Sequence, residues 1–339
     1  MSKIYIISKD WARSGKYSGY QKIINFLSVD FSLVRHNNLP YRIRRYFVKK
    51  TNLVNYKGEN ITKEFKILLK AFTTRRVHII YGEMDYYYLK LLKKFPFGSK
   101  KNILSATFHH PPYELENRLQ YNRKEVLGAL DKIIVMGSNQ IPFLKQYTNA
   151  EIKFIPHGID TSYFRPPARE GERKDQIFIF GISHRDHDRN LKIINRVNEV
   201  LDLRFIIVMF EEHAKLYEHI ENAEIITRNI NDVELLDFYQ TSKAVLMSFK
   251  ECTASNVILE ALATGCPLVM NNVGAVKEYI TEESGIQLFE TNDIEASVHY
   301  ISRLFTDDNF LNDVSKKHIE LAQSYTWEKV SKMTEDFLF

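Results

Sequence analysis

A segment that begins at Glu251 combines residue types suited to binding an anion. Its polar first part leads into a pattern that predicts a short helix over Asn256–Thr264, because Gly265 and Pro267 end the helix and an apolar strand, Leu268–Met270, follows. Small residues before a helix leave backbone N–H groups and the positive end of the helix dipole open to a ligand. The segment therefore predicts a site for a phosphate group or a sugar oxygen.

Two carboxylates, Glu251 and Glu260, flank this predicted anion site. A carboxylate only accepts hydrogen bonds, so beside a phosphate it usually binds hydroxyl groups, and those of a sugar or a ribose are natural donors. The combination predicts a site for a nucleotide-sugar. The backbone amides expected around the diphosphate are those of Thr253, Ala254, Ser255, Asn256 and Val257.

The same segment resembles the donor-site signature of the GT-B glycosyltransferases of retaining family 4. That signature is a Glu, seven residues and a second Glu, followed by Ala, a hydrophobic residue, Ala, any residue, Gly, any residue and Pro, and residues 260–267 match its second half. Eight residues separate Glu251 from Glu260, so Cys252 stands where the first Glu is expected. Either the loop has one extra residue and Glu251 still binds the sugar, or that contact is lost. Glu260 would hold the nucleotide ribose.

Strand-like and helix-like runs alternate along the chain, which indicates parallel sheets covered by helices on both faces. With the resemblance, this implies an α/β GT-B fold with two Rossmann-like domains facing a central cleft. We expect a basic, acceptor-binding domain at residues 1–165, a nucleotide-sugar-binding domain at 166–320, and a C-terminal helix at 321–339 that packs back on the first domain. The predicted strands are residues 3–8, 31–34, 77–80, 103–108, 132–136, 176–180, 204–209, 244–248 and 268–270, and the predicted helices are 20–27, 190–200, 232–240 and 256–264.

The formal net charge of +5 conceals two halves of opposite sign. Residues 1–165 contain 29 Lys and Arg and 12 Asp and Glu, a net charge of +17, whereas the remainder carries −12. Basic clusters at 42–45, 49–50 and 93–94 lie among aromatic residues and leucines, which favours docking at an anionic membrane that carries a lipid-linked acceptor. A solvated basic surface is the alternative. Nucleic acid is not expected as a partner, because no nucleic-acid-binding motif accompanies the charge.

A loop with two glycines, residues 14–20, follows the first predicted strand and precedes a helix. Gly15 and Gly19 permit the backbone to approach an anion closely, although the spacing is not that of a Walker loop. The family carries a Gly-rich loop at this point, near the donor phosphate or the acceptor. We therefore place both glycines in the expected donor site, with a plain strand-to-helix turn as the alternative.

Basic residues after the strand at 176–180 are expected to neutralise the donor diphosphate, as the family does with an Arg directly after a Gly. Ile182 occupies that position here, so Arg185 is the expected substitute, Arg189 the second choice and Ser183 a further donor contact. A guanidinium suits this role because its donors form a planar fork. Lys250 is the expected second cation. GT-B enzymes use protein cations at this point, so neither a metal ion nor another cofactor is expected.

Two histidines follow the strand at 103–108. In the family a His at this point faces the donor sugar, which makes His109 the expected catalytic residue and His110 the alternative on the acceptor side. A His can donate a hydrogen bond or polarise a hydroxyl group. The alternative is a His held in the turn before two prolines. Glu83, after the strand at 77–80, is expected to line the acceptor side, with helix capping as the alternative.

These features predict a retaining glycosyltransferase that moves a hexose-type sugar from a UDP- or GDP-sugar to a glycan or lipid-linked glycan in surface polysaccharide biosynthesis. The alternatives are a non-catalytic binding subunit of a glycosylation complex and a nucleotide-sugar 2-epimerase. Cys252 and Cys266 are not expected to form a disulfide, and the sequence predicts neither a signal peptide nor a membrane span. We therefore expect a cytoplasmic location, peripheral at the inner face of the membrane.

Overall fold

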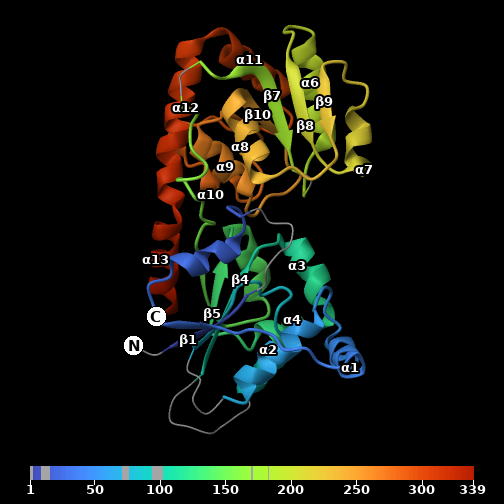
Figure 1. Cartoon of the computed structure of the whole chain (residues 1–339), viewed down its shortest axis with the longest axis vertical. Coiled ribbons are helices and arrows are strands. Elements are labelled where there is room, and N and C mark those ends of the chain that lie inside the picture. The colour runs from blue at the N-terminus through green and yellow to red at the C-terminus, as the bar shows by residue number, and fades with distance from the viewer. Residues whose placement is uncertain (1–2, 9–15, 71–75, 94–101, 169–170, 182) are drawn as a thin grey trace. The chain divides into compact units, whose positions relative to one another are not determined.

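The computed structural model describes residues 3–8, 16–70, 76–93, 102–168, 171–181 and 183–339, and the chain forms two compact units (Figure 1). The first unit contains Met1–Arg13, Tyr20–Pro156 and Val330–Phe339, and the second contains Ser14–Gly19 and His157–Lys329. The division after Pro156 falls earlier than the expected boundary at 165.

A six-stranded parallel sheet forms the centre of the first unit, in the order β2-β1-β3-β4-β5-β6. The order reverses between β1 and β3, and ligands of such sheets bind beyond the carboxyl ends of the strands at this switch point. The strands are β1 (Ile4–Ile7), β2 (Phe31–Leu33), β3 (Arg76–Ile79), β4 (Ile103–Phe108), β5 (Lys132–Val135) and β6 (Glu151–Phe154).

Helices and short 3₁₀ turns connect these strands, and the segment predicted as a helix at 20–27 is the 3₁₀ helix η1. The elements are η1 (Tyr20–Phe26), α1 (Tyr41–Thr51), α2 (Gly58–Leu68), η2 (Tyr88–Lys93), α3 (Pro112–Leu119), η3 (Gln120–Asn122), α4 (Arg123–Leu127), η4 (Ser138–Gln140) and α5 (Ile141–Lys145). Strand β6 and helices α1, α2, α3 and α4 were not predicted from the sequence.

The second unit contains a five-stranded parallel sheet in the order β11-β10-β7-β8-β9. The order reverses between β7 and β10, so the loops that leave these two strands meet at the switch point. The strands are β7 (Lys174–Phe180), β8 (Arg204–Val208), β9 (Ala223–Ile226), β10 (Ser242–Met247) and β11 (Leu268–Met270).

Local capping explains where several helices of the second unit begin and end. Helix α9 has the predicted bounds, Asn256–Thr264, because Gly265 adopts a left-handed conformation with φ +64° that stops it. Helix α6 begins earlier than predicted, since the Asp186 side chain accepts a hydrogen bond from the backbone N–H of Arg189 at 3.1 Å. The other elements are α6 (His187–Asn198), α7 (Glu211–Ala214), η5 (Lys215–Tyr217), α8 (Asp232–Thr241), α10 (Val276–Tyr279), η6 (Glu282–Ser284), α11 (Ile294–Thr306), α12 (Asp308–Ala322) and η7 (Gln323–Tyr325).

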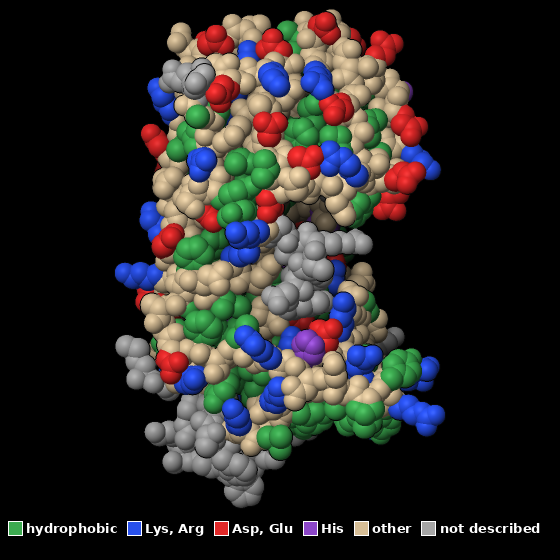
Figure 2. All heavy atoms as spheres, viewed as in Figure 1, with side chains coloured by type: hydrophobic (Ala, Val, Ile, Leu, Met, Phe, Trp, Pro, Cys, Tyr) green, Lys and Arg blue, Asp and Glu red, His purple; other side chains and the backbone are tan. Residues whose placement is uncertain are grey.

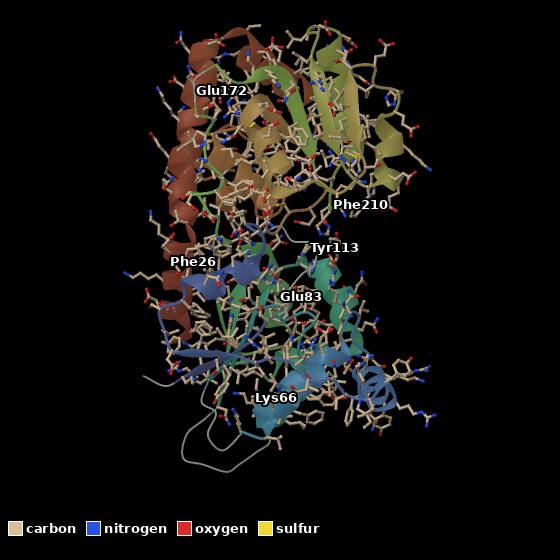
Figure 3. The ribbon with its side chains drawn as sticks, viewed as in Figure 1. Phe26, Lys66, Glu83, Tyr113, Glu172 and Phe210 are labelled. Carbon is tan, nitrogen blue, oxygen red and sulfur yellow. The ribbon has the colours of Figure 1, made fainter. Side chains whose placement is uncertain are left out.

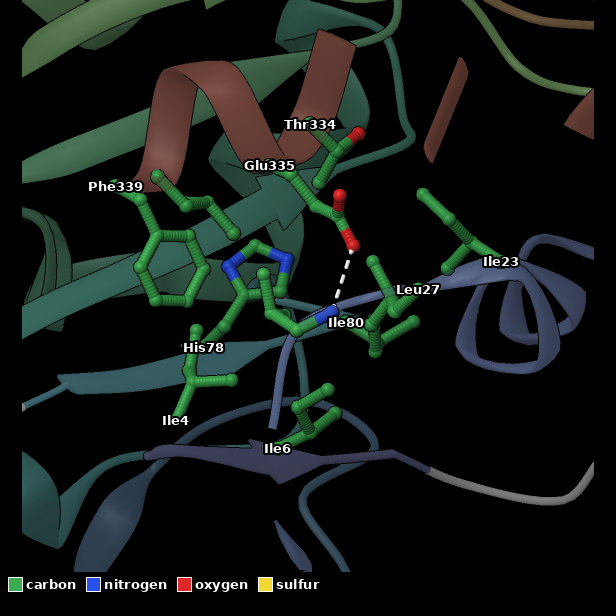
Figure 4. A pocket seen from close by; sticks show the side chains of 11 residues that line it. Ile4, Ile6, Ile23, Leu27, His78, Ile80, Thr334, Glu335 and Phe339 are labelled. Atoms are coloured by element: carbon green, nitrogen blue, oxygen red, sulfur yellow. Dashed lines mark hydrogen bonds between the residues drawn. The ribbon is translucent and has the colours of Figure 1, made fainter. Parts of the chain in front are cut away.

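The last helix, α13 (Trp327–Leu338), ends within the first unit. There the carbonyl oxygen of Phe337 accepts a hydrogen bond from Nζ of Lys132 at 2.6 Å. The Glu335 carboxylate accepts from the hydroxyl of Ser28 at 2.7 Å and from the backbone N–H of Val29 at 3.2 Å. A small apolar pocket lies under this helix, lined by side chains of β1, η1, β3 and α13 (Figure 4). Across the described segments, no helix has the length and apolar character needed to cross a membrane.

Candidate active site

The loops that follow β7 and β10 are joined at the switch point of the second unit. The backbone N–H of Asp186 donates to the carbonyl of Ser248 at 2.9 Å, and that of Lys250 donates to the carbonyl of His184 at 2.8 Å. Arg185 and Phe249 form an isolated antiparallel bridge between these contacts. The two loops therefore hold the predicted cation Arg185 beside the chain that leads into α9.

Arg185 is a buried cation without a carboxylate partner among the described residues. Its guanidinium lies over the Phe249 ring at 4.3 Å, and among the described residues it donates to two carbonyl oxygens, those of Ser183 at 3.2 Å and Phe180 at 3.4 Å. Its Nε has no partner in this part of the chain. Burial lowers the pKa of Arg185 to about 10, which reflects the cost of a desolvated charge. An incoming anion would remove this cost.

The start of α9 offers further hydrogen-bond donors in the same region. Ser255 occupies the N-cap position but makes no side-chain capping bond, and the first turn contains no acidic residue. No side chain therefore caps the first N–H groups of the helix; that of Ile258 donates to the carbonyl of Ser255 at 3.1 Å, and those of Asn256 and Val257 have no protein partner among the described residues, which suits a ligand. The Thr253 side chain is buried, and its hydroxyl has no hydrogen-bond partner within the described segments. Ala254, Ser255 and Asn256 are partly exposed, and Val257 is buried.

Glu251 and Cys252 are the two candidates for the position of the first Glu of the family signature, and they differ in exposure. Cys252 is buried, so its side chain is withdrawn from the surface. Glu251 is partly exposed, and its Oε1 accepts the backbone N–H of Cys252 at 3.0 Å. A Cβ at Gly274 would come within 2.2 Å of that same oxygen, so the glycine makes room for the carboxylate. Lys250 beside it is exposed.

Glu260 is almost completely buried, with 2% of its surface exposed. Its two carboxylate oxygens accept hydrogen bonds from the hydroxyls of Ser18 at 2.8 Å and Tyr239 at 2.9 Å. Burial raises the pKa of Glu260 to about 7. The carboxylate therefore binds hydroxyl groups, as its chemistry predicted, but the groups it holds here belong to the protein.

The Gly-rich loop and Glu260, far apart in sequence, are thus brought together. Besides the Ser18 contact, the backbone N–H of Lys16 donates to Asp232 at 2.7 Å, and Tyr17 stacks on Tyr163. Gly19 adopts φ +98°, a conformation that favours glycine. Gly15 lies outside the described residues.

Arg189, our second choice for the diphosphate-binding arginine, is a structural residue. All three nitrogens of its guanidinium are engaged inside the second unit, with Ser248 at 2.9 Å, Ser297 at 2.8 Å and the carbonyl of Thr291 at 2.9 Å. Its position in the first turn of α6 points the side chain into the unit. Ser183 is exposed, and its described contact is the carbonyl that accepts from Arg185.

The first unit contains a cluster of charged residues after β3 and β4. Glu83, labelled in Figure 3, is fully buried. Oε1 of its carboxylate lies 3.3 Å from Nδ1 of His109 and 3.7 Å from Nε2 of His110. Because no part of Glu83 is exposed, it does not line an acceptor site as we expected. His109 retains partial exposure, 14% of its side chain, and its ring lies between those of Tyr20 at 4.9 Å and Tyr81 at 4.8 Å.

His110 is held by carboxylates on both sides, which argues against the acceptor role that we expected as an alternative. Its Nε2 faces Glu83, and its Nδ1 lies 3.1 Å from Glu114. Arg118 in turn donates to Glu114 at 2.9 Å. Both ring nitrogens of His110 therefore face carboxylates of the first unit.

Two residues of the second-unit site were missed in the sequence. Ser18 lies in the glycine loop that drew attention, but nothing in that loop marks its hydroxyl as the partner of Glu260. Tyr239 lies near the end of α8, where an apolar residue is expected on the inner face. Only the contact of its hydroxyl with Glu260 reveals its role.

Comparison with known proteins confirms the resemblance to GT-B glycosyltransferases. Residues 176–307 match the family model described as glycosyl transferases group 1. The chain is 25% identical over 193 residues to a UDP-Gal:alpha-D-GlcNAc-diphosphoundecaprenol alpha-1,3-galactosyltransferase from Escherichia coli, which covers 49% of this chain and 48% of the relative. The chain spans about half or less of the length of the curated relatives that it matches.

Solved structures with the same fold cover nearly the whole chain. Sucrose-phosphate synthase from Thermosynechococcus elongatus superposes with a TM-score of 0.68 at 14% identity, over 99% of this chain and 98% of that one. HepE from Anabaena, in complex with UDP-glucose, superposes with a TM-score of 0.65 at 11% identity, over 98% of each chain. These similarities show the α/β GT-B fold.

Replacing the two buried arginines distinguishes Arg185, which has no carboxylate partner among the described residues, from Arg189, which is hydrogen-bonded through all three nitrogens. We expect Arg189→Met to lower the free energy of unfolding by about 3 kcal/mol, because several buried hydrogen bonds lose their donor. The matched variant Arg185→Met should change it by about 1 kcal/mol or less, since two weak hydrogen bonds and the cation–π contact with Phe249 are lost while an uncompensated charge is removed. Urea unfolding of both variants tests this. An equal loss in both would contradict the distinction.

The raised pKa of Glu260 predicts a pH-dependent effect of Glu260→Gln. The folded protein holds the carboxyl proton up to about pH 7, whereas the unfolded chain releases it near its ordinary pKa of 4.5, so wild-type stability falls as pH rises between these values. The free energy of unfolding of the variant minus that of the wild type should therefore increase from pH 5 to pH 8, by up to about 3 kcal/mol.

Glu234→Gln is the control for this titration. Hydrogen bonds from Arg228 and the backbone of Asn231 lower the pKa of Glu234 to about 2, so this group does not titrate above pH 5. Its difference from the wild type should stay constant in urea unfolding measured at the same pH values. A constant difference for Glu260→Gln as well would show that this carboxyl group does not titrate in the range.

Proposed function

We propose that the protein is a glycosyltransferase that takes its sugar from a nucleotide-sugar. The observation that carries the proposal is the buried Arg185 guanidinium, which has no carboxylate partner among the described residues and lies against the loop into the uncapped start of α9. A diphosphate would neutralise the guanidinium and accept from the helix amides. The match of residues 176–307 to glycosyl transferases group 1 supports the same reading.

The donor we favour is a UDP-sugar, with a GDP-sugar as the other candidate. The Escherichia coli relative is named for UDP-Gal, and the HepE structure holds UDP-glucose. In our proposal Glu260 binds the ribose hydroxyls, which requires the ribose to take the place of the Ser18 hydroxyl. Glu251, partly exposed beside Gly274, binds the sugar in place of the first Glu of the family signature. Exposed Lys250 supplies the second cation.

The reaction we propose retains the configuration of the sugar. The bond between the anomeric carbon and the diphosphate oxygen breaks, and the acceptor hydroxyl oxygen bonds to the same face of that carbon. The acceptor proton passes to the departing diphosphate oxygen, so the products are a glycoside and a nucleoside diphosphate. Arg185 and the α9 amides stabilise the negative charge that develops on the leaving group. We assign His109 a hydrogen bond to the reacting sugar or acceptor.

The acceptor we propose is a lipid-linked glycan of surface polysaccharide biosynthesis, reached from the cytoplasmic face of a membrane. The Escherichia coli relative is named for an acceptor on diphosphoundecaprenol. Helix α1 presents Tyr41, Ile43 and Tyr46 to solvent, at 62%, 45% and 56% exposure, while Phe47 packs on Phe65 and Tyr88 beneath it. Figure 2 shows Lys, Arg and hydrophobic side chains over this helix. Its exposed cations are Arg42, Arg45, Lys49 and Lys50.

A thermal-shift screen followed by a transfer assay tests the activity. We expect a UDP-sugar to raise the unfolding midpoint, since a ligand at about 100 times its Kd adds about 2.7 kcal/mol. The variant Arg185→Met should lose this shift, and Arg189→Lys, which retains buried donors, should keep it. Released UDP and a new glycoside should then appear with a lipid-diphosphate glycan. Failure of UDP-, GDP- and ADP-sugars alike to shift the wild type would exclude this function, and an epimer formed without acceptor would indicate an isomerase.

Vesicle binding tests the membrane proposal separately from catalysis. The wild type should sediment with vesicles of phosphatidylglycerol and phosphatidylcholine in equal parts, and less with phosphatidylcholine alone or in high salt. Reversing charge on α1 with Arg42→Glu and Arg45→Glu should weaken binding at least tenfold. The same charge change at exposed Lys316 and Lys317 on α12 is the control and should have little effect. Equal losses in both pairs would mean that α1 is not the docking element.

A further inference from the structure

Asn271, a fully buried residue of the second unit, forms two hydrogen bonds with the backbone of Phe249. Its Oδ1 accepts from the N–H of Phe249 at 2.8 Å, and its Nδ2 donates to the carbonyl oxygen of Phe249 at 2.9 Å. Nδ2 also donates to the hydroxyl of Thr291 at 3.0 Å. An amide side chain offers both an acceptor and a donor, so it satisfies the two backbone groups of one residue together.

The side chain of Asn271 takes the place of a neighbouring strand. Strands β10 and β11 pair as far as Met247 and Met270, and the backbone of Asn271 then forms an isolated bridge with Phe289. The chain beyond β10 therefore loses its strand partner on this side of the sheet. Unpaired backbone groups are costly when they are buried, and Phe249 is buried. The Asn271 amide supplies the missing pair of hydrogen bonds.

The residues on either side of Phe249 are held as well. The N–H of Ser248 donates to Oδ1 of Asn190 at 3.0 Å, and its carbonyl accepts from the N–H of Asp186 at 2.9 Å. The N–H of Lys250 donates to the carbonyl of His184 at 2.8 Å. With the two amide bonds described above, each backbone polar group from the N–H of Ser248 to the N–H of Lys250 has a partner. The segment is thus fixed in one extended conformation.

This segment carries the aromatic ring that contacts the Arg185 guanidinium. The two groups are 4.3 Å apart, and the face of an aromatic ring attracts a cation. The position of the ring follows from the backbone of Phe249, which the Asn271 amide holds. We propose that Asn271 is a positioning residue of the donor site, which acts through Phe249 to hold Arg185 where the diphosphate of a nucleotide-sugar binds. This inference deepens the proposed function and rests on it for the identity of the ligand.

Nitrogen-15 NMR of the full chain with labelled arginine tests the positioning without any ligand. The variant Arg185→Met assigns the Nε–H resonance of Arg185. In the wild type this resonance should be shifted upfield, because an aromatic ring shields the protons above its face. Asn271→Leu keeps a side chain of similar size without hydrogen-bonding groups, so the resonance should lose most of the upfield shift. An unchanged shift in this variant would overturn the proposal, and so would a wild-type resonance without the shift, even if Asn271→Leu fails to fold.

Calorimetry with UDP provides the second measurement. Asn271→Leu should raise the Kd for UDP about tenfold, since a guanidinium that is no longer held in place must be ordered on binding. The matched control is His318→Leu, which removes the acceptor of the Leu268 N–H at the opposite end of β11 and should leave the Kd near that of the wild type. An equal loss of affinity in both variants would contradict the proposal, because it would indicate a general loss of stability. If the wild type does not bind UDP, the proposed function fails, and the NMR result alone judges the role of Asn271.

Discussion

One uncompensated charge organises the second unit: the Arg185 guanidinium, buried over Phe249 without a carboxylate partner among the described residues. A protein rarely retains such a group unless a ligand completes it, because the desolvation cost recurs whenever the site is empty. The paired loops after β7 and β10 hold this cation in place. The uncapped start of α9 adds the positive end of a helix dipole. Everything else in the proposed donor site supplies groups around an anion placed there.

The first unit contains a buried charge of the opposite sign. One of its buried carboxylates is Glu83, which faces two histidines. Both arrangements follow strands next to a switch point, where loops of a parallel sheet escape the packing that fixes the strands. The sheets therefore determine where a site can form, and the loop residues determine the charge of that site. The apolar cores therefore stabilise the sheets, while the loops contain nearly all of the residues with a proposed function.

Local signals in the sequence were enough for most of the strands and for helices α6, α8 and α9, whereas helices such as α11 and α12 were not predicted. Helix α9 was predicted at its observed bounds because Gly265 and the following Pro267 stop it, and such signals act within a few residues. Strand β9 was missed, since its four residues, Ala-Glu-Ile-Ile, are too short to show a period. The order of the strands, and so the position of the switch points, follows from the two-domain pattern only through the resemblance to GT-B proteins.

The site was harder to predict, because its contacts join distant residues. Arg185 and Arg189 follow the same glycine and look equivalent in the sequence. Arg189, however, donates hydrogen bonds to Ser297 and Thr291, about a hundred residues away. Ser18 and Glu260 are separated by 242 positions, and no spacing rule connects them. Glu83 was read as an acceptor-side residue, whereas complete burial makes it a partner of the histidines. Sequence patterns give the residue types of a site, and packing decides which of them remain free.

The central claim is that the diphosphate of a nucleotide binds between Arg185 and the amino end of α9. A crystal structure of the protein with UDP tests it most directly. We predict the β-phosphate within hydrogen-bonding distance of the Arg185 guanidinium and of the first backbone amides of α9. The account is contradicted if UDP binds with its phosphates elsewhere while Arg185 still donates only to the carbonyls of Phe180 and Ser183.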